Sequence, residues 1–173
     1  MTNVFLIGSM GAGKTTVGRV LADQLNFEFY DSDEIIEARA GADIAWIFDV
    51  EGEAGFRQRE QRIIEEITQK NNIVLATGGG VVLIPQNRTL LAGRGFVVYL
   101  RISLQQQLER LRYDSKRPLL NQKDKIEDIL TKLHDHRDPI YSKLADLTLD
   151  TENLPLKMTV KQIIQAIPGG PAS

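Results

Sequence analysis

The chain of 173 residues is the size of one domain, and its 42% hydrophobic and 25% charged residues are ordinary for a globular protein. It has no cysteine, which excludes disulfides and thiolate metal sites, and its formal net charge of −2 argues against a nucleic-acid binder. No apolar run approaches the roughly 20 residues of a membrane-spanning helix and no targeting peptide is visible, so we expect a cytoplasmic protein that binds neither nucleic acid nor a membrane.

Short apolar runs alternate with segments whose apolar residues recur at helical spacing. A continuous apolar run such as Val4–Ile7 is typical of a strand that is buried on both faces of a parallel sheet. The alternation therefore predicts an α/β fold with three layers, in which helices cover a parallel sheet. In chain order, the expected elements are a strand at Val4–Ile7, a helix at Lys14–Leu25, a strand at Phe27–Tyr30, helices at Asp33–Arg39 and Phe56–Gln69, strands at Ile73–Thr77 and Phe96–Leu100, helices at Ser103–Arg112 and Asp124–Leu144, a strand at Leu147–Leu149 and a helix at Thr159–Ile167.

Local signals refine two of these helices. Asp31 or Ser32 is expected to cap the helix that starts at Asp33, because short polar side chains accept hydrogen bonds from the first free N–H groups. Pro139 lies inside the helix expected over Asp124–Leu144 and should kink or divide it, because proline lacks an N–H and crowds the preceding turn.

Two segments follow neither a helical nor a strand period. They are residues 114–123, which are polar and charged, and Thr151–Lys157. Within a compact domain such segments are candidates for a lid and a ligand loop. We expect a single domain over residues 1–167 with a mobile lid at about residues 112–124, and a disordered tail over residues 168–173.

The first loop carries the strongest chemical signal. Gly8–Thr15, GSMGAGKT, matches G-x-x-x-x-G-K-[ST] between a strand and a helix, which is the context of a phosphate-binding P-loop. Its backbone N–H groups and the helix N-terminus would surround phosphate oxygens. Lys14 would reach the β- and γ-phosphates and the Thr15 hydroxyl would ligate Mg²⁺, so the loop favours nucleoside triphosphate binding over a chance glycine-rich turn. The expected nucleotide contacts are Gly11, Ala12, Gly13, Lys14, Thr15 and Thr16.

A P-loop alone does not distinguish a kinase from a GTPase switch or a motor. A GTPase needs Asn-Lys-x-Asp after a strand to read guanine, but Asn121–Asp124 has these letters in another order and follows no expected strand. Asp49–Gly52 imitates the switch pattern Asp-x-x-Gly, yet it precedes the third strand in a stretch that we expect to be helical. Both matches are interpreted as accidental.

Two carboxylates follow the second strand, at the edge where open α/β sheets bind ligands. Alternation along the chain places Asp31 and Asp33 on the same side. Beside a P-loop, such a pair can organise Mg²⁺ through water, or orient and deprotonate an attacking hydroxyl. Helix capping alone is the competing interpretation.

Glycines and arginines complete the candidate site. Thr77–Gly80 ends the third strand, and three glycines in a row favour a backbone that approaches a ligand closely over a merely flexible turn. Arg57 and Glu60 are three residues apart on one expected helix, so the carboxylate can hold the guanidinium in place. Arg117 lies in the expected lid and Arg137 beside the proline of the long helix, although each arginine taken singly is more typical of a solvated surface.

Taken in order, these motifs resemble the shikimate kinases, a family of nucleoside-monophosphate-kinase-like P-loop proteins. The resemblance runs from Asn3 to about Ile167 and rests on GSMGAGKT, DSD, GEAGFR with Glu60, TGGG, RPLL and RDPIY. It implies a P-loop kinase fold whose parallel sheet has five strands in the order 2-3-1-4-5. It also implies transfer of the ATP γ-phosphoryl group to the 3-hydroxyl of shikimate in aromatic amino-acid biosynthesis, with ATP and Mg²⁺ bound.

The resemblance also implies roles for individual residues. Asp33 is similar to the residue that binds the shikimate hydroxyls and acts as base, and Asp31 to the aspartate that reaches Mg²⁺ through water. Arg117 is similar to the lid arginine that closes on the transferring phosphoryl group. The clamp for the shikimate carboxylate and ring would be Arg57, Arg137, Gly79 and Gly80, with Phe48 and Phe56 as an apolar wall. The adenine site would be Arg110, Asn153 and Pro155.

Two other functions stay open at this point. A different small-molecule kinase, such as a gluconate kinase, would also bind an anionic polyol. A catalytically idle nucleotide-binding regulator could keep the same fold, although the set of Asp33, Arg57 and Arg137 argues against it. In each case we expect a monomer whose partners are small molecules.

Overall fold

The computed structural model describes residues 2–112 and 123–169. Most of the lid predicted at residues 112–124, including Arg117, lies outside the described residues, and so do residues 170–173 of the predicted tail. Within the described ranges, no helix is both long enough and apolar enough to cross a membrane.

Five parallel strands form one sheet, as predicted. They are β1 (Val4–Ile7), β2 (Glu28–Asp31), β3 (Ile73–Ala76), β4 (Phe96–Arg101) and β5 (Leu147–Asp150). Their order across the sheet is β2-β3-β1-β4-β5, and every neighbouring pair is parallel. The central strands β1 and β3 are buried along their whole length, which explains their uninterrupted apolar sequences.

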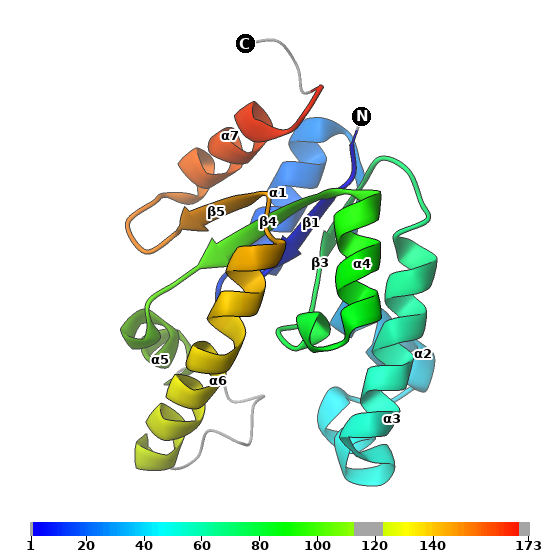
Figure 1. Cartoon of the computed structure of the whole chain (residues 1–173), viewed down its shortest axis with the longest axis vertical. Helices are drawn as coiled ribbons and strands as arrows, with labels where there is room; N and C mark the ends of the chain where they lie inside the picture. Colours follow the sequence, from blue (N-terminus) through cyan, green and yellow to red (C-terminus); the bar gives the residue numbers. More distant parts are fainter. Residues whose placement is uncertain (1, 113–122, 170–173) are drawn as a thin grey trace.

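Helices cover both faces of this sheet and bury one core on each (Figure 1). Alternation divides β1 between the two cores, because Phe5 and Ile7 belong to one and Val4 and Leu6 to the other. The predicted three layers are therefore confirmed. The first core is completed by α2 (Ser32–Ala40), α3 (Ile44–Ile67), α4 (Pro85–Arg94) and α6 (Lys123–Leu144), and the second by α1 (Lys14–Leu25) and α7 (Leu156–Ala166).

Helix α3 begins at Ile44 rather than at the predicted Phe56. Gly52 interrupts its geometry with φ 74° and ψ 176°, a conformation that is almost restricted to glycine. The first segment of α3 also exposes half of Trp46 and more than half of Val50. Because a glycine break and exposed apolar residues disturb the helical period, the sequence pattern showed only the second segment clearly.

Three other elements also differ from the sequence prediction. Helix α4 and a short 3₁₀ helix at Val81–Leu83 were not predicted, because α4 is largely polar and has no clear apolar period. Helix α7 begins at Leu156 instead of Thr159, so the predicted ligand loop is shorter than Thr151–Lys157.

The sequence predicted that Pro139 kinks or divides α6, and the structure shows that it does not divide the helix, which continues through Pro139 as one element. Side chains on either side of the proline are held by the core. Asp138 Oδ1 accepts a hydrogen bond of 2.7 Å from the Tyr99 hydroxyl on β4, and Tyr141 is only 2% exposed. This packing offsets the hydrogen bond that proline removes.

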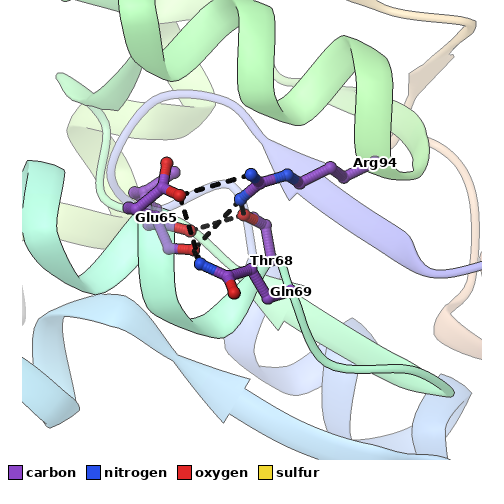
Figure 2. A network of polar contacts seen from close by, with 5 residues as sticks. Glu65, Thr68, Gln69 and Arg94 are labelled. Atoms are coloured by element: carbon purple, nitrogen blue, oxygen red, sulfur yellow. Dashed lines mark hydrogen bonds and ion pairs between the residues drawn. The ribbon is translucent and has the colours of Figure 1, made fainter.

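Arg94 joins the end of α4 to the end of α3 (Figure 2). Its Nη1 donates to the Glu65 carbonyl at 3.0 Å and to Thr68 Oγ1 at 2.9 Å, while its Nη2 lies 3.3 Å from Glu65 Oε1. Gln69 Nε2 donates to the same Glu65 carbonyl at 3.0 Å. A cation at this place satisfies the Glu65 carbonyl in the last turn of α3 and faces the negative end of the helix dipole.

We expect Arg94→Met to lower the free energy of unfolding by about 1–2 kcal/mol, because methionine cannot make these charge-assisted hydrogen bonds. The melting temperature, followed by circular dichroism, should fall by about 2–4 °C per kcal/mol. Arg19→Met is the matched control, since Arg19 pairs with Glu34 at 3.2 Å while both side chains are more than half exposed. Equal shifts in the two variants would contradict the capping role of Arg94.

Candidate active site

The carboxyl ends of β1, β2 and β3 lie at one edge of the sheet. In the register of these strands, Leu6 lies opposite Ala76, and Ala76 lies opposite Asp31. The P-loop follows β1, the two aspartates lie at the end of β2 and the start of α2, and the triple glycine follows β3. The strand order thus brings three motifs that are far apart in sequence to the place where α/β sheets bind ligands.

The P-loop presents the open N-terminus of α1. Gly13 is the residue before the helix, with φ 87°, and no side chain caps the first turn. Lys14 Nζ donates to the carbonyls of Gly8 at 2.5 Å and Ser9 at 2.8 Å, so the ammonium is folded back over the loop. Uncapped N–H groups next to a lysine form the type of cradle that binds phosphate.

Helix α5 (Leu104–Arg112) holds the P-loop from its other side. Gln107 Nε2 donates to the Met10 carbonyl at 2.9 Å, and Arg110 Nη1 donates to the Gly11 carbonyl at 2.6 Å. The Gln107 side chain is buried, at 4% exposure, whereas Arg110 is exposed. Arg110, predicted to contact adenine, therefore lies at the rim of the phosphate loop.

Asp31 connects the P-loop to α2. Its Oδ1 accepts from the backbone N–H groups of Asp33 at 2.9 Å and Glu34 at 3.2 Å, and its Oδ2 accepts from Thr15 Oγ1 at 2.7 Å. The predicted cap of α2 is thus Asp31, and capping uses only one of its two oxygens. The other oxygen faces the hydroxyl that P-loop proteins use for Mg²⁺.

These two side-chain oxygens would suit Mg²⁺, which keeps several waters and takes only one or two protein ligands beside substrate phosphates. Within residues 2–112 and 123–169, no group of three or more His, Cys, Asp or Glu residues could hold a metal ion. The described residues therefore do not form a site of three or more such side chains that would enclose the metal ion.

Charged side chains lie directly against the first and third residues of the triple glycine. A Cβ atom on Gly78 would lie 2.7 Å from Asp33 Oδ1, and a Cβ atom on Gly80 would lie 2.2 Å from Arg57 Nη2. A Cβ atom at either position would push Asp33 or Arg57 away from its present place, so glycine is what lets these charged groups approach the backbone so closely. Asp33 lies in the first turn of α2 and not in a strand, so helix geometry and not strand alternation places it.

The middle glycine lies between α6 and the P-loop. A Cβ atom on Gly79 would lie 3.4 Å from Arg137 Nη1 and 3.6 Å from the backbone nitrogen of Met10. The Tyr141 hydroxyl, one turn further along α6, donates to the Gly79 carbonyl. The triple glycine is therefore the point where Asp33, Arg57 and Arg137 come together beside the phosphate loop.

Arg57 is held from two sides on α3. Its Nη1 donates to Glu60 Oε1 at 2.8 Å, and its guanidinium lies 5.1 Å from the centre of the Phe56 ring. Phe48 lies across the break in α3, with its ring centre 4.8 Å from that of Phe56. Phe56 is 4% exposed and Phe48 is 36% exposed, so one predicted wall residue is buried and the other faces outward.

Burial raises the pKa of Glu60 from 4.5 to about 7. The negative charge of Asp33 raises this pKa further. The Arg57 cation lowers the pKa, but it does not outweigh the loss of solvent around a fully buried carboxyl group. Glu60 Oε2 has no hydrogen-bond partner among the described residues, which is why the charged form is poorly stabilised.

This raised pKa predicts a pH dependence of stability. The native protein binds more protons than the unfolded chain between pH 4.5 and about 7, so the free energy of unfolding should fall as the pH rises through that window. We expect Glu60→Gln to remove a slope of up to about 1.4 kcal/mol per pH unit, measured by urea unfolding between about pH 5 and about pH 8. Glu109→Gln, at an exposed position of α5, is the control. A wild-type slope that Glu60→Gln leaves unchanged would disprove the assignment.

The predicted adenine loop lies near the start of α5. Asn153 and Pro155 are exposed between β5 and α7, and Ser103 Oγ donates to Glu152 Oε1 in the same loop at 3.0 Å. Because α5 carries Arg110, the predicted adenine residues belong to neighbouring segments. Arg117 lies outside the described residues.

Sequence reasoning missed three polar side chains that hold the site's backbone. Ser32 Oγ accepts from the Gly78 N–H at 3.1 Å, Gln107 holds the P-loop and Tyr141 holds Gly79. Ser32 and Tyr141 lie inside the DSD and RDPIY motifs, and this membership was the signal available in the sequence. Gln107 had no such signal, because a glutamine on a polar helix is usually exposed.

Comparisons with known proteins give one consistent family. A family model described as shikimate kinase matches residues 10–168. A shikimate kinase from Legionella pneumophila (strain Corby) is 60% identical over 96% of this chain and 95% of its own length. The structure of a shikimate kinase from Acinetobacter baumannii in complex with shikimate is 45% identical and superposes with a TM-score of 0.90 over 95% of this chain and 92% of that one. A shikimate kinase structure from Aquifex aeolicus, 36% identical, gives a TM-score of 0.83 over 95% of both chains. The chain belongs to the shikimate kinase family.

Proposed function

We propose that this chain transfers the γ-phosphoryl group of ATP to the 3-hydroxyl of shikimate, giving shikimate 3-phosphate and ADP in aromatic amino-acid biosynthesis. One observation carries the proposal beyond family membership. Two arginines and an aspartate meet at a triple glycine whose middle residue lies beside the P-loop backbone. Such an arrangement suits a small acceptor with a carboxylate and hydroxyl groups, bound next to the phosphate that it receives.

Arg57 and Arg137 would hold the carboxylate of the acceptor together with the Gly79–Gly80 backbone. The buried Nε atom of Arg137 has no hydrogen-bond partner among the described residues, and the buried Nε atom of Arg57 has only a long ion-pair contact, 3.7 Å from Glu53 Oε1. Buried guanidinium N–H groups are costly when they are unpaired, so they favour a bound anion. Phe48 and Phe56 would pack beneath the ring of the acceptor.

Asp33 would accept the proton of the attacking hydroxyl group. The oxygen then forms a bond to the γ-phosphorus, the bond from that phosphorus to the bridging oxygen of ADP breaks, and the electron pair stays on ADP. Lys14 and the P-loop N–H groups would balance the charge that develops between the β- and γ-phosphates. Arg117 in the predicted lid would complete this charge stabilisation.

Thr15 would ligate Mg²⁺ directly and Asp31 would reach it through water. Their 2.7 Å hydrogen bond, which brings both oxygens close together beside the P-loop, supports this assignment. A bound Mg²⁺ would supply positive charge to the β- and γ-phosphates. Arg110, Asn153 and Pro155 would contact adenine, with Gly11, Ala12, Gly13 and Thr16 on the phosphates.

We also propose that the chain acts as a monomer in the cytoplasm, with small molecules as its partners. The acceptor residues all come from this one chain, which supports a site that needs no second subunit. Analytical ultracentrifugation at assay concentrations tests the oligomeric state, and a dimer there would refute the proposal.

A coupled ADP-release assay tests the reaction. We expect ATP turnover with shikimate, and none above background with gluconate, with nucleoside monophosphates or without an acceptor. Turnover with gluconate would favour the alternative kinase, and the absence of turnover with every acceptor would favour an idle regulator.

A further inference from the structure

The carbonyl groups of the triple glycine are held in two different ways. Gly78 and Gly80 use local turns, because their carbonyls accept from the N–H groups of Val81 and Leu83, both at 3.1 Å. The Gly79 carbonyl accepts instead from the hydroxyl of Tyr141, a residue 62 positions away on α6. The orientation of this one peptide therefore depends on a side chain.

That peptide also carries the N–H group of Gly80. A trans peptide unit is planar, so its C=O and N–H groups point in opposite directions. None of the peptide bonds in the described residues is cis. When Tyr141 holds the Gly79 carbonyl on one side, it fixes the direction of the Gly80 N–H on the other.

Tyr141 is itself held rigidly. Its side chain is 2% exposed, and its ring centre lies 4.8 Å from that of Tyr99 on β4. The Tyr99 hydroxyl donates to Asp138 Oδ1 at 2.7 Å, which fixes the turn of α6 before Tyr141. Arg137 lies one helical turn before Tyr141, so both residues face Gly79 from the same side of α6.

Tyr141 keeps its proton under working conditions. Burial raises the pKa of its hydroxyl to about 12, although the positive charge of Arg137 and a hydrogen bond from Arg137 to this hydroxyl act in the opposite direction. A protonated hydroxyl is required here, because a carbonyl oxygen can only accept a hydrogen bond.

We propose that Tyr141 is a positioning residue for the acceptor: by holding the Gly79 carbonyl, its hydroxyl aims the Gly80 N–H at the acceptor carboxylate beside Arg57 and Arg137. This inference rests on the proposed function. Tyr141 touches no reacting atom, and the carboxylate keeps its charge throughout phosphoryl transfer. Its contribution is therefore expected in binding of the acceptor and not in the chemical step.

Steady-state kinetics of Tyr141→Phe test the proposal. We expect the KM for shikimate to rise about tenfold, which corresponds to about 1.4 kcal/mol, with kcat and the KM for ATP within about twofold of the wild type. The control is Thr68→Val, which removes a buried hydroxyl that donates to the Ile64 carbonyl at 2.6 Å and bonds no residue of the triple glycine. Its shikimate KM should stay within about twofold. An unchanged KM in Tyr141→Phe, or an equal rise in both variants, would overturn the proposal.

Two further measurements test the proposed contact between the Gly80 N–H and the acceptor carboxylate. With an acceptor analogue that lacks the carboxylate, Tyr141→Phe should bind as well as the wild type, whereas an equal loss for both acceptors would contradict the proposed geometry. In the wild type, the Gly80 amide resonance should shift when shikimate binds without nucleotide, and a Gly80 resonance that does not move would also overturn the proposal. Failure of the wild type to use shikimate would instead refute the proposed function.

Discussion

Lys14→Ala is expected to reduce kcat by about 100- to 1,000-fold, the usual effect of removing one fixed charge-stabilising donor from a transition state. In the structure, Lys14 Nζ donates hydrogen bonds to the Gly8 and Ser9 carbonyls of the P-loop. From there it can reach the bridge between the β- and γ-phosphates, where negative charge develops as the phosphoryl group leaves ADP. Neighbouring N–H groups cannot replace a mobile ammonium group.

The ADP-release assay at saturating ATP and shikimate measures this effect. Lys161→Ala is the control, because Lys161 is an exposed lysine on α7. Circular dichroism and thermal unfolding should show that Lys14→Ala is folded. A folded Lys14→Ala variant with turnover close to the wild type would refute the role of the P-loop as a catalytic phosphate cradle.

The second large effect concerns the arginines that meet at the triple glycine. Arg57→Ala and Arg137→Ala should each raise the KM for shikimate by at least about 30-fold, because truncating one partner of a buried charge pair costs about 2–5 kcal/mol. The carboxylate charge is the same in the ground state and the transition state, so kcat should change much less. Arg57→Lys should also fail, since an ammonium group cannot reproduce a planar guanidinium that donates two parallel hydrogen bonds.

Arg59→Ala is the matched control for Arg57→Ala on the same helix. Arg59 lies two residues away and donates to both carboxylate oxygens of Glu51, at 2.8 Å and 3.0 Å from its Nε. We expect a shikimate KM close to that of the wild type for this variant.

Arg117→Ala should differ from the clamp variants, because the lid arginine is predicted to contact the phosphoryl group as its charge redistributes. Its loss should therefore reduce mainly kcat. If Arg57→Ala left the shikimate KM unchanged while Arg117→Ala raised it, this division of roles would be wrong. The measurement is steady-state kinetics with shikimate varied at saturating ATP.

The sequence alone determined those features whose physical cause is local. The P-loop is recognisable because phosphate binding needs glycines and a lysine at fixed spacing between a strand and a helix. The sheet was predictable because strands buried on both faces must be continuously apolar, as β1 and β3 are. Asp31 could be named as a candidate cap, because the side chains of the first residues of a helix bond to nearby N–H groups.

Only the tertiary structure decided how distant residues act together. It showed that α6 passes through Pro139 as one helix, because the contacts of Asp138 and Tyr141 with β4 and Gly79 offset the missing hydrogen bond. It buried Glu60 completely, which raises its pKa in a way that the spacing to Arg57 does not reveal. Burial and long-range contacts depend on which elements pack together, and a one-dimensional pattern reports only the neighbours along the chain.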